Sequence, residues 1–246
     1  MIETFKLCKT FEDKKRGLVT AADNVSFRVS PGEIFGLLGL NGAGKTTTLR
    51  MLAALLKPTS GSASICGIDV VKEPESAKAK LGFLTGSTGL YGRLETHEMI
   101  EYFGKLYGLT PEKAKSRAQN LMDLFGLTEY AQTRCEKLST GNKQKVSVAR
   151  TMIHDPAVII LDEPTAGLDV IAGRTVVQFI NSEKNRSKTI IFSTHVMHEA
   201  DKLCDRIGII HKGRIIAIGT PTELKEKAGC HDMDDTFVKL VGNDVS

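Results

Sequence analysis

The sequence lacks any long apolar run and any block of basic residues. No stretch approaches the roughly 20 consecutive apolar residues that a helix needs to span a bilayer. The N-terminal segment MIETFKLCKTFEDKK has no apolar core of a signal peptide. Acidic and basic residues alternate along the chain, so the net charge of +4 does not indicate nucleic-acid binding. We therefore expect any role at a membrane to depend on a partner subunit.

Cysteine is sparse, and its spacing argues against two classes of stabilised domain. The five cysteines are odd in number and widely spaced, which matches neither a disulfide framework nor a zinc site. This usage indicates reduced thiols in the cytosol. Apolar residues make up 41% of the 246 residues and charged residues 25%, the balance of a globular protein. We expect residues 1–246 to form one domain with a subdomain.

Short apolar runs alternate with amphipathic segments, which predicts an α/β fold with a mostly parallel sheet covered by helices. The clearest runs are residues 34–39, 157–161 and 189–193, and polar or glycine-rich residues follow each of them. Ligands gather at the carboxyl ends of strands in such sheets. Residues 26–29 and 62–66 predict a small antiparallel sheet beside this core. Residues 206–210 and 214–218 predict a hairpin, and residues 222–228 a short helix.

The middle of the chain, residues 96–153, is expected to form an inserted helical subdomain, with residues 1–95 and 154–246 forming the core. Thr96 is the expected N-cap of a first helix, and Thr110 with Pro111 opens a second that ends at Gly126. A third helix is expected to begin near Ser139. The apolar residues expected to face inward on these helices are Met99, Ile100, Phe103, Leu106, Tyr107, Ala114, Ala118, Leu121, Phe125, Val146, Ala149 and Ile153.

The segment GLNGAGKTT matches the phosphate-loop pattern G-x-x-x-x-G-K-[ST]. Its glycines let backbone N–H groups approach phosphate oxygens, Lys45 places a positive charge on the β- and γ-phosphates, and Thr46 offers a hydroxyl to Mg²⁺. A helix over residues 46–56 is expected to follow, and its N-terminus favours an anion. A chance glycine-rich turn is the alternative, but the flanking strand and helix favour a nucleotide site. The candidate residues are Gly39, Leu40, Asn41, Gly42, Ala43, Gly44, Lys45, Thr46 and Thr47.

The second apolar run ends in two adjacent carboxylates, Asp162 and Glu163. Burying such a pair is costly unless a cation meets it. Together with the phosphate loop upstream, Asp162 is expected to reach the Mg²⁺ shell, and Glu163 to orient or deprotonate the attacking water. No N-K-x-D motif for guanine occurs, which favours ATP over GTP as the nucleotide.

The segment VIILDEPTAGLD, residues 158–169, closely resembles the Walker B and D-loop segment of ATP-binding cassette (ABC) proteins. The resemblance covers almost the whole chain, with the motifs in the family's order. It implies a P-loop NTPase (RecA-like) core, a small antiparallel β-subdomain, an inserted helical subdomain, and ATP and Mg²⁺ as ligands. Within the family the chain is most similar to ATPase subunits of sodium-efflux and drug-efflux exporters. Such a subunit is cytoplasmic and is held at the inner face of the cell membrane by a membrane-spanning subunit.

Three further motifs follow from this resemblance. The segment LSTGN, residues 138–142, stands where the family has LSGGQ, which implies that Ser139 and Gly141 contact the γ-phosphate of ATP on a second copy or a homologous ATPase subunit. Read alone, LSTGN is also an ordinary helix cap. His195 matches the switch histidine, although with His198 it also invites a metal interpretation that lacks a third ligand. Phe11 matches the aromatic residue that stacks on adenine, and a core or surface role is the alternative.

The sequence departs from the family pattern at the subunit contacts. Gly86 stands where the family has a glutamine that ligates Mg²⁺ and senses the membrane subunit, so Thr85, Ser87, backbone or water has to substitute. Thr140 and Asn142 replace a glycine and a glutamine of the signature motif. The main hypothesis is therefore an ATPase subunit of a membrane exporter, with Glu163 and His195 catalytic. The alternative is a regulatory or assembly module that binds ATP without driving transport. A DNA-repair or translation protein is disfavoured because only an ordinary subdomain separates Lys45 from Asp162.

Overall fold

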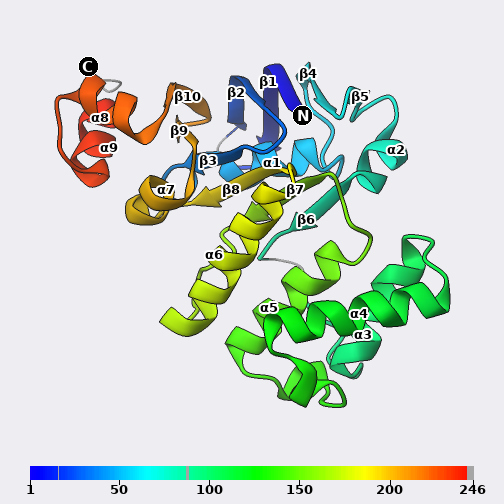
Figure 1. The fold of residues 1–246 in the computed structure, drawn as a ribbon. Coiled ribbons are helices and arrows are strands. Elements are labelled where there is room, and N and C mark those ends of the chain that lie inside the picture. Colours follow the sequence, from blue (N-terminus) through cyan, green and yellow to red (C-terminus); the bar gives the residue numbers. More distant parts are fainter. Residues whose placement is uncertain (16, 87–88, 243–246) are drawn as a thin grey trace. The chain divides into compact units, whose positions relative to one another are not determined.

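The computed structural model describes residues 1–15, 17–86 and 89–242 (Figure 1). The chain divides into two compact units. The first contains Met1–Leu81, Ala157–Glu163 and Glu183–Ser246, and the second contains Gly82–Pro156 and Pro164–Ser182. The predicted helical subdomain, residues 96–153, lies wholly inside the second unit.

The described residues form a six-stranded sheet that is mostly parallel. β3 (Ile34–Leu38) pairs in parallel with β8 (Thr189–Thr194) and β9 (Arg206–His211), and β7 (Val158–Asp162) pairs in parallel with β8. β9 and β10 (Arg214–Gly219) form the predicted antiparallel hairpin. The three apolar runs that predicted core strands became β3, β7 and β8, and every residue of these strands is buried. In spatial order the strands are β10 (Arg214–Gly219), β9 (Arg206–His211), β3 (Ile34–Leu38), β8 (Thr189–Thr194), β7 (Val158–Asp162) and β6 (Leu81–Leu84).

The predicted antiparallel sheet is also present, and it is larger than expected. Its strand order is β2 (Gly17–Val29), β1 (Ile2–Asp13), β4 (Ser60–Ile65) and β5 (Ile68–Asp69). The strands β1, β5 and β6 were not predicted. The sequence does not predict β1 because its register shifts between Thr4 and Leu7, where Lys6 adopts φ 44°. Such a bulge breaks the period-two alternation of apolar and polar residues that is typical of a strand.

The helix after the phosphate loop, α1, spans Lys45–Leu52 and is shorter than the predicted residues 46–56. Leu49 and Leu52 are buried as expected. The helix ends early because Ala54 adopts φ 54°, in the left-handed region, which stops the hydrogen-bond ladder. Leu56 is therefore outside the helix and only partly buried. In the first unit, α7 (Met197–Leu203) packs against β3 and β8.

The second unit contains the three expected helices, α3 (Thr96–Leu106), α4 (Pro111–Phe125) and α5 (Thr140–Met152). The limits of α4 are as predicted, with Thr110 as N-cap and Gly126 as a left-handed C-cap. The start of α5 is confirmed as well, because the Ser139 hydroxyl accepts a hydrogen bond from the Asn142 N–H.

Two expectations about α3 are wrong. Its N-cap is Glu95, which forms a capping box with Glu98, while the hydroxyl of Thr96 donates to the Thr133 carbonyl at 3.1 Å. Leu106 and Tyr107 are exposed, because the buried stripe runs through Met99, Ile100 and Gly104. A Cβ at Gly104 would lie 2.9 Å from Ile153 Cγ1, so α3 packs closely through the face that carries Gly104. Leu106 lies away from this face and is exposed.

None of the helices in the described ranges is both long and apolar enough to cross a bilayer. The remaining elements are α2 (Pro74–Ala79), η1 (Thr128–Tyr130), η2 (Cys135–Lys137), α6 (Val170–Asn185), α8 (Pro221–Ala228) and α9 (Met233–Gly242).

Candidate nucleotide-binding and catalytic site

The phosphate loop leaves the buried strand β3 and turns into α1, with Gly44 as the N-cap at φ 104°. Glycine is required there by close packing as well as by this backbone angle. A Cβ at Gly44 would lie 2.3 Å from the Ala21 carbonyl oxygen, and one at Gly39 would lie 2.5 Å from the Ile210 carbonyl oxygen. The Gly213 N–H donates to the Ala43 carbonyl at 2.9 Å, so the turn between β9 and β10 supports the loop from behind.

The loop encloses a cavity of 160 Å³. This volume is below the range of about 300–1,000 Å³ for pockets that bury a whole small molecule. The cavity is therefore too small to bury an entire nucleotide. Its lining brings the predicted loop residues together with Glu163 and adds Ala21, which was not predicted. The lining residues are Ala21, Leu40, Asn41, Gly42, Gly44, Lys45, Thr46, Thr47 and Glu163.

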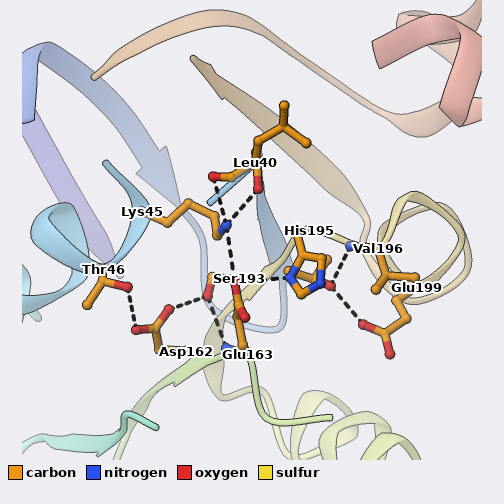
Figure 2. A network of polar contacts seen from close by, with 11 residues as sticks. Leu40, Lys45, Thr46, Asp162, Glu163, Ser193, His195, Val196 and Glu199 are labelled. Atoms are coloured by element: carbon orange, nitrogen blue, oxygen red, sulfur yellow. Dashed lines mark hydrogen bonds and ion pairs between the residues drawn. The ribbon is translucent and has the colours of Figure 1, made fainter. Parts of the chain in front are cut away.

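Lys45 lies at the centre of the site, and its side chain is only 5% exposed. Its ammonium group donates to the carbonyl oxygens of Gly39, at 2.6 Å, and Leu40, at 3.3 Å. It also forms an ion pair with Glu163 Oε1 at 3.1 Å (Figure 2). A buried ammonium held by the loop is in place to meet phosphate oxygens entering the same cavity.

Asp162 is the last residue of β7, and both of its carboxylate oxygens accept hydrogen bonds. Thr46 Oγ1 donates to Oδ2 at 2.8 Å, and Ser193 Oγ donates to Oδ1 at 2.6 Å (Figure 2). The hydroxyl of Thr46 and the carboxylate of Asp162 thus converge across 116 residues of sequence. Hard oxygen ligands on one side of a phosphate pocket are the donor set that suits Mg²⁺, which takes few protein ligands and completes its shell with phosphates and water. The residues present therefore fit this ion.

Glu163 follows Asp162 and contacts both Lys45 and His195. Its Oε1 atom lies 3.1 Å from Lys45 Nζ and 3.2 Å from His195 Nδ1. Partial burial raises the pKa of the Glu163 carboxyl, but the hydrogen bonds and charges of Lys45 and His195 outweigh it, and the pKa lies below its ordinary value. Glu163 is thus ionised at neutral pH and can accept a hydrogen bond from a water molecule.

His195 lies directly after β8, in a turn held by its neighbours. The Thr194 hydroxyl donates to Glu199 Oε2 at 2.8 Å and accepts from the Val196 N–H at 3.0 Å. The imidazole ring is partly exposed and faces Glu163 (Figure 2). In the part of the chain that is described, no group of three or more His, Cys, Asp or Glu side chains could hold a metal ion. The geometry therefore places His195 with the carboxylate rather than in a histidine metal site.

Other candidate residues lie outside this cluster. Phe11 is on β1, 40% exposed, with Lys9 Nζ at 5.2 Å from its ring centroid. Ser139 and Gly141 belong to the second unit, where a Cβ at Gly141 would lie 3.3 Å from Ala172 Cβ. Gly86 is exposed and a Cβ there would meet no atom within 4 Å.

Ser87, named as a substitute for the missing glutamine, lies outside the described residues, whereas Thr85 is buried. Ser193 was not named among the candidate residues although it bonds both acidic residues. The only signal for it was a polar residue inside the apolar run TIIFST.

A glycine-rich loop between a buried parallel strand and a helix, facing adjacent carboxylates from the same sheet, defines a P-loop nucleoside triphosphatase. Comparison with known proteins identifies the family. The ABC transporter family model matches residues 22–166. The chain is 43% identical over 243 residues to the ABC transporter ATP-binding protein NatA of Bacillus subtilis, covering 98% of each chain. It is 39% identical to the linearmycin resistance ATP-binding protein LnrL of the same organism, covering 92% of this chain and 72% of LnrL.

Comparison with solved structures supports the same family. The dimeric post-hydrolysis state of the ATP-binding cassette MJ0796, bound to ADP and Pi, superimposes with a TM-score of 0.82 at 25% identity, covering 90% of this chain and 99% of the other. The chain belongs to the ABC transporter family. It is an ATP-binding, ATP-hydrolysing subunit of an ABC membrane transporter. The predicted family, fold class and ATPase activity are confirmed.

Proposed function

We propose that this ATPase drives an exporter, with Glu163 as the catalytic carboxylate and Mg²⁺ as the required ion. The observation that supports the catalytic role of Glu163 is the contact of one of its oxygens with both Lys45 and His195 beside the phosphate cavity. The resistance role in the name of LnrL supports export, since that relative shares most of this chain.

The geometry supports the following division of labour. Lys45 and the loop N–H groups bind the β- and γ-phosphates, and Thr46 and Asp162 would hold Mg²⁺, which would neutralise phosphate charge. Glu163 accepts a hydrogen bond from the attacking water, so that the water oxygen is directed at the γ-phosphorus in line with the leaving oxygen. His195 contacts the same carboxylate oxygen through Nδ1, and we assign its ring to contact with the γ-phosphate.

The site is completed by a second subunit. Ser139 is the N-cap of α5, and its hydroxyl and the first N–H groups of that helix form an anion-binding helix start. We assign these groups and Gly141 to the γ-phosphate held by the phosphate loop of a second copy or a homologous subunit. The dimeric form of the MJ0796 cassette supports this arrangement. The ring of Phe11 is 40% exposed, and we assign it to stacking on adenine.

A membrane-spanning subunit is the proposed partner of the second unit, and it would hold the chain at the inner face of the cell membrane. Tyr91 is 55% exposed, and its ring lies 5.9 Å from that of Tyr102 in an edge-to-face pair. Exposed aromatic rings of this kind are typical of protein interfaces. Residues 86–93 and α3 therefore supply the docking surface, of which residues 87–88 lie outside the described ranges.

A second candidate function is a regulatory module that binds ATP without driving transport. The departures at Gly86, Thr140 and Asn142 favour it, because all three stand at proposed subunit contacts. Hydrolysis measured with and without a candidate membrane subunit separates the two functions. Stimulation by the membrane subunit supports the exporter, and its absence with every candidate favours the regulatory module.

The variant Glu163→Gln tests the proposed catalytic role. It keeps the shape of the side chain and removes its charge, so ATP binding and dimer formation should persist while turnover falls below detection. Glu75→Gln is the matched control, because Glu75 is exposed and pairs with Lys78 on the surface. Steady-state phosphate release, nucleotide binding and size-exclusion chromatography provide the readouts. Hydrolysis by Glu163→Gln at the rate of the control would contradict the role of Glu163.

A further inference from the structure

Ser193 is a polar residue in an apolar position. It lies on β8, between β3 and β7 in the sheet, and its exposure is 0%. The preceding residues on the strand are Ile190, Ile191 and Phe192, all buried as well. A hydroxyl in such a place is costly unless every hydrogen-bonding function is used. Its partners therefore indicate why the strand carries serine rather than another apolar residue.

The hydroxyl of Ser193 bonds to both acidic residues of the site. Ser193 Oγ donates to Asp162 Oδ1 at 2.6 Å. The Glu163 N–H donates to Ser193 Oγ at 3.1 Å and to the Ser193 carbonyl at 3.1 Å. A hydroxyl has a single hydrogen to donate, so donation to Asp162 leaves its lone pairs for the Glu163 N–H. The Ser193 hydroxyl is thus a hydrogen-bond donor to Asp162 and an acceptor from Glu163 (Figure 2).

For Asp162, this bond fixes which of the two carboxylate oxygens faces the phosphate loop. Oδ1 is held by Ser193, and Oδ2 receives the Thr46 hydroxyl at 2.8 Å. The carboxylate plane is therefore fixed from two sides, with Oδ2 turned toward the phosphate loop. Without the Ser193 hydroxyl, the carboxylate could rotate and Oδ1 would be left buried without this donor.

For Glu163, the bond holds an unfavourable backbone conformation. Glu163 has φ 51°, in the left-handed region that residues with a Cβ rarely adopt. Strained residues of this kind persist only when the surroundings determine them. The two acceptors on Ser193 hold the Glu163 N–H in this conformation, and the conformation directs the Glu163 side chain toward Lys45 and His195.

We propose that Ser193 is a positioning residue that orients Asp162 and Glu163 together for ATP hydrolysis. The inference rests on the roles proposed above for these two residues. Ser193 is buried and acts only through them. A single hydroxyl between the metal-side carboxylate and the water-side carboxylate links their geometry, so that loss of the hydroxyl disturbs both at once.

The test compares Ser193→Ala with Thr189→Val. Thr189 lies on the same strand, is 1% exposed, and its hydroxyl accepts a hydrogen bond from the N-terminal ammonium at 2.9 Å. Both variants thus remove one buried, bonded hydroxyl from β8, but only one of them faces the acidic pair. Ser193→Cys is the third variant, because the thiol fills the space and donates only weakly; it serves if the alanine variant does not fold.

Three measurements are made on each variant, namely kcat and KM for ATP, thermal unfolding, and Mn²⁺ affinity of the ADP-bound protein by electron paramagnetic resonance. For Ser193→Ala we expect kcat to fall about 10- to 100-fold and Mn²⁺ affinity about 10-fold, with KM changed little. Ser193→Cys should lie between it and the unchanged protein. Thr189→Val should lower only the unfolding temperature.

Two outcomes overturn the inference. The first is unchanged kcat and Mn²⁺ affinity in Ser193→Ala or in Ser193→Cys, and the second is an equal loss of both in Thr189→Val. Failure of the proposed function is distinguishable from either, because it appears as persistent hydrolysis in Glu163→Gln. If Glu163→Gln is inactive while the Ser193 variants are normal, only the positioning role of Ser193 is wrong.

Discussion

Replacing Gly44 by alanine tests whether the phosphate loop depends on its packing as well as on its own residues. Gly44 has φ 104°, and a Cβ there would lie 2.3 Å from the Ala21 carbonyl oxygen and 3.2 Å from Gly213 Cα. Carbon–oxygen contacts normally begin at about 3.3 Å, so the loop or the Ala21 backbone has to move by roughly 1 Å. Neither neighbour is the end of a flexible side chain.

The expected loss of stability in Gly44→Ala has two parts. The backbone angle alone costs an L-residue about 1–2 kcal/mol, and forcing an extra carbon into a packed site adds about 1–3 kcal/mol. Each kcal/mol corresponds to about 2–4 °C in the unfolding temperature of a chain of this size. A displacement of about 1 Å at a reacting centre can cost roughly 100-fold in rate. We therefore expect Gly44→Ala to lose both stability and turnover.

Gly67→Ala is the matched control. Gly67 has φ 79° in the turn between β4 and β5, and a Cβ there meets no atom within 4 Å. Its replacement should cost only the backbone term, about 1–2 kcal/mol, and leave ATP hydrolysis unchanged. Calorimetry and phosphate release measure the two effects. Hydrolysis by Gly44→Ala within about threefold of the unchanged protein, against the roughly 100-fold loss expected, would refute the packing argument.

Two further predictions concern titrating groups. Asp123 accepts hydrogen bonds from Thr128 and Gln119 that lower its pKa, so its stabilisation is present above the unfolded pKa of about 3.9 and is lost as pH falls through the folded pKa. Asp123→Asn should therefore reduce the free energy of urea unfolding at neutral pH and less in acid, and equal stability at neutral pH would contradict this. Burial raises the pKa of the Cys204 thiol, so iodoacetamide should modify exposed Cys66 in the folded protein and Cys204 only after unfolding, as peptide mass spectrometry can establish.

Features encoded by neighbouring residues could be predicted from the sequence. Helix α4 is an example, since Thr110, Pro111 and Gly126 determine its ends through bonds within a few residues. The N-cap of α3 was missed for the opposite reason. The Thr96 hydroxyl bonds to Thr133, a partner 37 residues away, and Glu95 takes over the cap. Local propensity does not reveal a competing partner that distant.

The candidate site likewise contains features that the sequence predicts and features that it does not. The phosphate loop and the pair of Asp162 and Glu163 are contiguous motifs, and each was identified from the residue types that phosphate and metal chemistry require. The supporting groups at Ala21 and Gly213 were not identified. Their contribution consists of a carbonyl and a turn that approach Gly44, and any residue type supplies a carbonyl.

The class of chemistry can be predicted from residue order alone, because the groups that bind a nucleotide lie within short motifs and their residue types are restricted. How those groups are held depends on contacts that exist only in the folded protein. The parallel pairing of β7 with β8 places Asp162 opposite Ser193, and the 2.6 Å bond between them depends on that register. A shift of one residue would turn Ser193 to the other face of the sheet. Hydrogen bonds need their partners within about 3 Å, and across 31 residues of sequence only the folded sheet sets such a distance.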